Sequence, residues 1–188
     1  MAKTRDWQAM RDMSARLLKE RTGEGVDTWN RRIQRERFDD EEALRAWLTK
    51  QGVTGYAQSL LVMERFGYPD FLLATADELI DGQYADRPQL RPIFDAIIDA
   101  ASGLGAVTTQ ARKTFVALVS PRRTFARIQP TTRNRVDLSL RLEGRKPRGR
   151  LQPSKINETM PVQIELTVRD QVDSEVVAWL QQAYDENR

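Results

Sequence analysis

The spacing of apolar residues changes once along this chain. Up to about residue 102, apolar residues recur three or four positions apart, which is the period of amphipathic helices. The clearest helical stretch starts at Pro88 and ends at Gly103, with Leu90, Ile93 and Ile97 on one stripe. Beyond it, apolar and polar residues alternate, which is typical of strands that bury one face. The chain therefore predicts a helical part followed by a part built on strands.

Helix-start signals divide the first part into several short helices. Thr75 and Glu78 have the spacing of a capping box. The acidic run at 39–42 stands where the positive end of a helix dipole stabilises carboxylates, and this use is favoured over Mg²⁺ binding because no supporting ligand is evident. In chain order, we expect helices at 5–21, from Asp27, from the acidic run, after Gly55, from Thr75 and at 88–103.

The second part is expected to form an antiparallel sheet. Two strands at 115–119 and 124–129 are separated by a turn and form a hairpin, and strands at 136–142 and 162–168 follow. A final helix begins near Asp173. Consecutive strands flanked by two helices predict an α+β fold with the helices on one face of the sheet. We expect an all-helical module over 1–86 and an α+β module over 87–188, in which the Gly/Pro-containing segment 143–161 is an exposed, mobile loop.

Charge is segregated along the chain, although the net value is only +3. Residues 112–155 contain thirteen lysines or arginines but only Asp137 and Glu143, a balance of +11. The flanking parts, 1–111 and 156–188, carry −3 and −5. Such segregation creates a local positive field and indicates a polyanionic partner, of which nucleic acid is the leading candidate.

Nine cations are the candidate anion-binding residues. Strand alternation predicts that Arg135 and Arg141 share the wet face of one strand, while the hairpin and the loop extend that surface. The alternative is that these side chains are solvated and balanced by carboxylates of the same chain. The nine residues are Arg122, Arg123, Arg127, Arg135, Arg141, Arg145, Lys146, Arg148 and Arg150.

Two local patterns near these residues have ordinary alternatives. Residues 145–150, RKPRGR, are similar to the core of an AT-hook, but Leu151 stands where a proline is expected, and this favours a plain Gly/Pro loop. The tryptophans and tyrosines could stack bases only if exposed, and their helical spacing favours core positions. Among these aromatic residues, Tyr56, which follows the pair Gly52 and Gly55, is selected as the candidate for base stacking.

The chain contains no cysteine and no histidine. Thiol nucleophiles, histidine bases and zinc sites built on these residues are therefore excluded. Carboxylate-bound Mg²⁺, a hydroxyl activated by lysine and electrostatic catalysis by arginine remain, but no catalytic motif supports them. We expect a non-enzymatic binding protein without a cofactor. An enzyme acting on a phosphorylated small molecule is the weakest alternative.

Four segments resemble a known group of proteins. They are TGEGVDTWNRRI, GVTGYAQSLLV, RKTFVALVSPRRTFARIQPTTRNRVDLSLRLEG and VVAWLQQAYDENR. The first two are similar to the N-terminal helical module of an uncharacterised bacterial group, and the last two to a small α+β domain often joined to it. Both are known only as domains of unknown function, so the resemblance implies a two-part architecture and no activity.

Three further expectations concern partners and location. Nucleic acid or another polyanion is the expected partner. The alternative is an adaptor, in which the acidic surface of residues 38–111 docks on the basic block of the same or another chain. No stretch approaches the length of a membrane span, so we expect no membrane partner and a cytoplasmic location.

Overall fold

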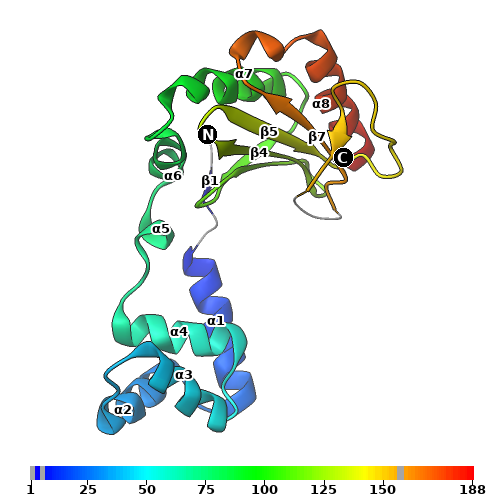
Figure 1. The fold of residues 1–188 in the computed structure, drawn as a ribbon. Coiled ribbons are helices and arrows are strands. Elements are labelled where there is room, and N and C mark those ends of the chain that lie inside the picture. Colours follow the sequence, from blue (N-terminus) through cyan, green and yellow to red (C-terminus); the bar gives the residue numbers. More distant parts are fainter. Residues whose placement is uncertain (1–2, 5–6, 156–158) are drawn as a thin grey trace. The chain divides into compact units, whose positions relative to one another are not determined.

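The computed structural model describes residues 3–4, 7–155 and 159–188, with side chains from residue 8 onward (Figure 1). It divides into two compact units. The helical unit runs from α1 to Ala74, and the sheet unit comprises β1 (Lys3–Thr4) and Thr75–Arg188. The sequence predicts two modules that fold separately and meet between residues 86 and 87. Separate folding is a property of the isolated parts, so this boundary stays a prediction.

The helical unit is a small bundle with its own core. Asp40 caps α3 because its carboxylate accepts a hydrogen bond from the Ala43 amide at 2.8 Å, as the acidic helix start suggested. The core consists of apolar side chains spaced along four helices, with Leu18, Leu44, Leu48 and Leu61 fully buried. These four are α1 (Trp7–Thr22), α2 (Val26–Glu36), α3 (Glu41–Lys50) and α4 (Gly55–Phe66), and the short helix α5 (Asp70–Leu73) follows them without a buried residue.

The sheet unit confirms the predicted α+β class. Its strands are ordered β1-β2-β3-β4-β5-β7-β6, and every neighbouring pair is antiparallel except β1 with β2. Helices α7 and α8 cover one face (Figure 1). The elements are α6 (Ala76–Tyr84), η1 (Pro88–Leu90), α7 (Arg91–Ser102), β2 (Thr108–Ala111), β3 (Val116–Val119), β4 (Thr124–Thr132), β5 (Arg135–Leu140), β6 (Gln152–Pro153), β7 (Val162–Leu166), η2 (Arg169–Gln171) and α8 (Ser174–Asn187).

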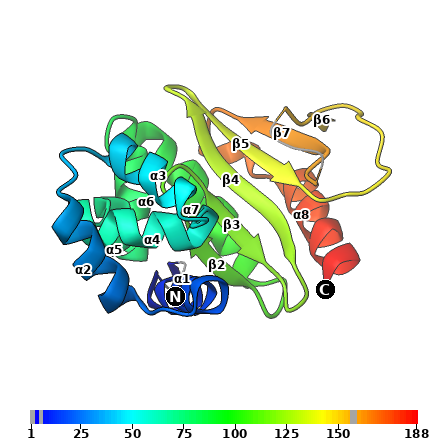
Figure 2. The same cartoon turned by 90° about the horizontal axis from the view of Figure 1, so that it is seen from below.

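Alternation along the central strands separates an apolar face from a polar one. Leu138 of β5 lies between Ile128 of β4 and Ile164 of β7, and all three are fully buried under the helices. The intervening residues point to the opposite face, which no described helix of this unit covers (Figure 2). Asp137 and Ser139 on that face are nonetheless buried. Arginines on this face are therefore held among polar neighbours.

The segment 143–161 is only partly the exposed loop expected from its composition. Leu151 is fully buried because it joins the apolar core of the sheet unit, and Met160 is also buried. Gln152–Pro153 pairs with β7 as the edge strand β6. In Figure 2, the part of this segment between β5 and β6 reaches beyond the β7 edge. Isolated apolar residues thus anchor a segment whose remaining residues are mostly polar, glycine or proline.

Tyr84 gives the sheet unit a sensitivity to alkaline pH. Its ring packs against Phe94 with a centroid separation of 5.4 Å, and its hydroxyl is buried with no hydrogen-bond partner among the described residues. Burial raises the pKa of Tyr84 well above its usual range, because the ionised phenolate would lack water. Above about pH 10, the unfolded chain ionises this group while the folded chain does not, so stability falls as pH rises.

We expect Tyr84→Phe to raise the free energy of unfolding by about 1 kcal/mol at neutral pH, because it removes an unpaired buried hydroxyl. Above about pH 10, the free energy of unfolding should fall with pH less steeply for the variant than for the wild type. The two slopes should differ by about 1.4 kcal/mol per pH unit. Urea unfolding at neutral pH and at several alkaline pH values measures both effects. Equal slopes would show that the Tyr84 hydroxyl reaches water.

Candidate anion-binding site

The structure separates the nine candidate cations into three groups. Arg127 and Arg135 lie on the polar face of the sheet, and Arg150 lies beside the start of α8. The other six come from the β3–β4 turn, the end of β5 and the beginning of the loop. We call these six the basic end: Arg122, Arg123, Arg141, Arg145, Lys146 and Arg148.

Ser120 organises the turn of the basic end. Its hydroxyl oxygen accepts hydrogen bonds from the amides of Arg122 and Arg123 at 3.2 and 3.1 Å. The same hydroxyl lies 2.6 Å from the carbonyl oxygen of Asn187, to which it donates. These bonds fasten the β3–β4 turn to the end of α8. The Arg122 side chain is exposed there.

Glu143 lies between two arginines of the basic end. Its Oε1 is 3.4 Å from Arg123 and 3.8 Å from Arg141. Arg141 also donates from Nε to the carbonyl oxygen of Thr124 at 2.9 Å. One carboxylate shared by two guanidinium groups leaves this trio with a net positive charge.

Trp179 of α8 positions two cations of the loop. The guanidinium carbons of Arg145 and Arg148 lie 5.7 and 5.1 Å from its ring centroid, within the range of cation–π attraction. Arg145 also pairs with Glu186 at 3.3 Å. Within the ranges that the structure describes, the ion pairs of the six cations bring only Glu143 and Glu186, which leaves a net charge of +4 for these eight residues.

Three members of the basic end have no ion-pair partner within the described part of the chain: Arg122, Lys146 and Arg148. All three side chains are exposed. A hollow of about 410 Å³ opens between Lys146 and its neighbours and is lined by Glu143, Gly144, Arg145, Lys146 and Arg148. The surface therefore offers unpaired cations around a depression.

Arg127 is held against the sheet. Its guanidinium carbon lies 3.7 Å from the centroid of Phe115, and its Nη2 donates to Gln129 at 2.6 Å. Burial lowers the pKa of this guanidinium, because the charged form loses water. Part of the Arg127 charge is thus removed from water.

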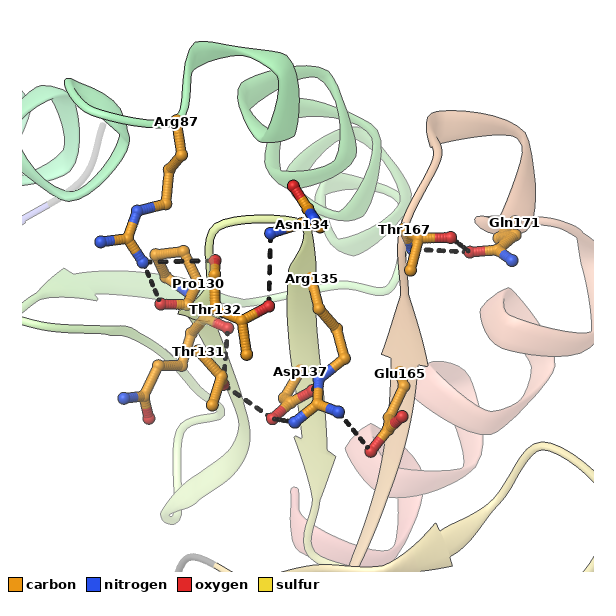
Figure 3. Close-up of polar contacts among 11 residues, drawn as sticks. Arg87, Pro130, Thr131, Thr132, Asn134, Arg135, Asp137, Glu165, Thr167 and Gln171 are labelled. Atoms are coloured by element: carbon orange, nitrogen blue, oxygen red, sulfur yellow. Dashed lines mark hydrogen bonds and ion pairs between the residues drawn. The ribbon is translucent and has the colours of Figure 1, made fainter.

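Arg135 is neutralised by two carboxylates on the polar face (Figure 3). Its guanidinium lies 2.9 Å from Asp137 and 3.0 Å from Glu165. Thr131 donates a hydrogen bond to Asp137 at 2.7 Å, which fixes that buried carboxylate further. Arg135 therefore belongs to a closed polar network of neighbouring strands.

Arg150 is also paired, and this excludes an AT-hook conformation. It donates to the carbonyl oxygen of Gln171 at 2.6 Å and lies 2.7 Å from Asp173. A hydrogen bond from the Val176 amide, followed by Arg150, holds the pKa of Asp173 below its usual range. Gly149 has φ +57°, and Arg148 pairs with Leu151 across this turn. An AT-hook needs an extended chain with two free arginines, and neither condition holds here.

Tyr56 lies in the helical unit. It is 54% exposed, which meets the condition set for base stacking. It borders a cavity of about 30 Å³ together with Met10, Leu60 and Met63. Its role as a stacking residue stays a prediction.

Sequence reasoning missed the part that α8 takes in the site. The helical spacing of Trp179 predicted a core residue, and it is 8% exposed, but its ring also supports Arg145 and Arg148.

No cluster of three acidic side chains within the described ranges is arranged to hold a metal ion. None of the described helices has the length and apolar character needed to cross a membrane.

Comparison with known proteins identifies a family and no closer relative. A family model with the description "Domain of unknown function (DUF5655)" matches residues 80–187. This range contains all nine candidate cations and Trp179. Searches of curated proteins and of solved structures returned no match.

Proposed function

Because the chain belongs to the DUF5655 family, whose description assigns no activity, we propose its function from the geometry of the site: a non-enzymatic protein that binds a polyanion, nucleic acid in particular, through the basic end. The supporting observation is the net charge of +4 at one end of the sheet. Unpaired, exposed cations release counterions from a phosphate backbone on binding, and this release drives association.

The proposed contact set is smaller than the nine residues expected from the sequence. Arg135 and Arg150 are each paired with two carboxylates, so a phosphate would have to displace existing ion pairs. Arg127 is partly buried over Phe115. Phosphate contacts are therefore assigned to the six cations of the basic end, with Arg122, Lys146 and Arg148 contributing most.

Binding of a labelled DNA duplex across a salt series tests this proposal. Four to six phosphate contacts give a slope of about −3.5 to −5.5 in a plot of log K against log[salt]. The variant Arg122→Gln/Lys146→Gln/Arg148→Gln should reduce the steepness of that slope by about 2.5, because about three contacts are removed. Its affinity should fall by more than about tenfold at ~50 mM salt.

A matched control uses three exposed arginines of the helical unit. The variant Arg16→Gln/Arg31→Gln/Arg35→Gln removes the same charge from helices α1 and α2. Its slope should equal that of the wild type. Equal losses in both triple variants would mean that only the overall charge matters. An absence of DNA binding at ~50 mM salt, together with salt-sensitive self-association in sedimentation, would support the adaptor alternative instead.

A bacterial cytoplasm is the proposed location. The support for it is the resemblance of both parts of the chain to an uncharacterised bacterial group, and nucleic acid is abundant in that compartment. Expression of a tagged chain in a bacterium, followed by fractionation, tests the location. Recovery mainly outside the cytoplasm would contradict it.

A further inference from the structure

Two hollows adjoin at the basic end. The first, of about 480 Å³, is lined by Arg148, Gly149, Glu175, Ala178, Trp179 and Gln182. The second is the hollow of about 410 Å³ beside Lys146. Arg148 lines both, so they are neighbours. Each lies within the range of about 300–1,000 Å³ that is usual for small-molecule sites.

The two hollows differ in chemistry. The first combines the indole of Trp179 and the methyl group of Ala178 with the side chains of Glu175 and Gln182. Gln182 donates its amide hydrogen to Glu186 at 2.8 Å, which directs its carbonyl oxygen to other donors. This hollow therefore offers a flat apolar wall and hydrogen-bond acceptors.

The second hollow is cationic. Arg145, Lys146 and Arg148 line it, while Glu143, which also lines it, is already shared by Arg123 and Arg141. A phosphate group accepts hydrogen bonds on several oxygens and suits such a donor set. Glycine at 144 leaves this rim without a side chain.

Arg148 links the two environments. Its guanidinium lies over the Trp179 ring and is exposed to solvent on the loop. A guanidinium supported in this way can stack on a base and still donate hydrogen bonds to a phosphate. One ligand with a flat base and a phosphate would satisfy both hollows.

We propose that these adjoining hollows bind a nucleotide, with the base beside Trp179 and Arg148 and the phosphate between Arg145 and Lys146. This inference rests on the proposed function and names its ligand as an unpaired nucleotide, either free or within a single strand. The acceptors on Glu175 and Gln182 favour bases that carry an exocyclic amino group. A base inside a duplex is not accessible to this hollow, so single strands bind more tightly than duplexes.

Titration calorimetry with four small probes tests the site. We expect adenosine 5′-monophosphate to bind at least about tenfold more tightly than ribose 5-phosphate, because stacking adds to the phosphate contact. Adenosine should also bind more weakly than the monophosphate. Uridine 5′-monophosphate, which has no exocyclic amino group, should bind more weakly than the adenine nucleotide.

Two glutamine variants distinguish the loss of a base contact from a general effect of changing a glutamine on α8. Gln182→Met should lower the affinity for adenosine 5′-monophosphate about threefold to tenfold and leave that for ribose 5-phosphate unchanged. Gln181→Met is the matched control, because Gln181 is the adjacent residue of α8 and bonds instead to Asp185 at 3.0 Å. An equal loss in both variants would contradict the proposed base contact.

A single-stranded oligonucleotide and an abasic oligonucleotide of the same length distinguish the two proposals. If both bind equally and with a steep salt dependence, and if ribose 5-phosphate equals adenosine 5′-monophosphate, the nucleotide site is overturned and polyanion binding stands. If the mononucleotide binds selectively but DNA shows no salt-dependent affinity, the nucleotide site stands and the proposed function fails. If no probe binds at ~50 mM salt, both are overturned.

Discussion

Replacing Phe125 with alanine is expected to lower the free energy of unfolding of the sheet unit by about 3–5 kcal/mol. Phe125 of β4 is fully buried, and its ring meets Tyr184 of α8 edge-on with a centroid separation of 5.4 Å. Truncation removes both the apolar contact area and an aromatic pair, and the packed sheet cannot collapse around the cavity. The same contact holds α8, so anion binding at the basic end should weaken as well.

Urea unfolding followed by circular dichroism measures this effect. Val168→Ala is the control, because Val168 is 55% exposed in the same unit and its truncation should change stability by less than about 0.5 kcal/mol. A loss below about 1 kcal/mol for Phe125→Ala would mean that α8 is held mainly by other contacts.

Replacing Gly105 with alanine is expected to cost about 2–4 kcal/mol of stability. Gly105 has φ +136°, a conformation that residues with a side chain rarely adopt. An added Cβ would lie 2.7 Å from the hydroxyl of Tyr184, which is itself buried against Phe125. Backbone strain and a steric clash therefore act together.

Gly103→Ala is a close control for this variant. Gly103 lies two residues earlier, has φ −85°, and an added Cβ would come no nearer than 3.7 Å to the Ala100 carbonyl oxygen. This change should leave thermal stability nearly unaltered. Similar melting temperatures for both variants would contradict the steric argument at Gly105.

The sequence predicted those parts of the fold whose pattern is local. Val136, Leu138 and Leu140 alternate with polar residues and form β5 as expected, because one face of that strand is buried. The strand Thr108–Ala111 was not predicted, because its residues TTQA have no apolar alternation and its pairing with β3 defines it. Long-range pairing of this kind leaves no local signal.

Charge patterning indicated which part of the chain is rich in cations but could not distinguish paired cations from unpaired ones. Arg135 and Arg148 look alike in sequence, yet Arg135 lies between Asp137 and Glu165 while Arg148 has no carboxylate partner among the described residues. The partners come from other strands and helices, so only the folded register assigns them. Trp179 shows the same limit, because its spacing along α8 predicts burial and gives no sign of the arginines packed on its ring.

Amide chemical-shift mapping during a titration with single-stranded DNA at low salt tests the central claim most directly. We predict that the largest shifts fall on residues 120–123 and 141–148 and on the part of α8 that contains Trp179 and Gln182. Shifts concentrated on Arg16, Arg31 and Arg35 of the helical unit, or none at any position, would contradict the assignment of the basic end as the anion-binding surface.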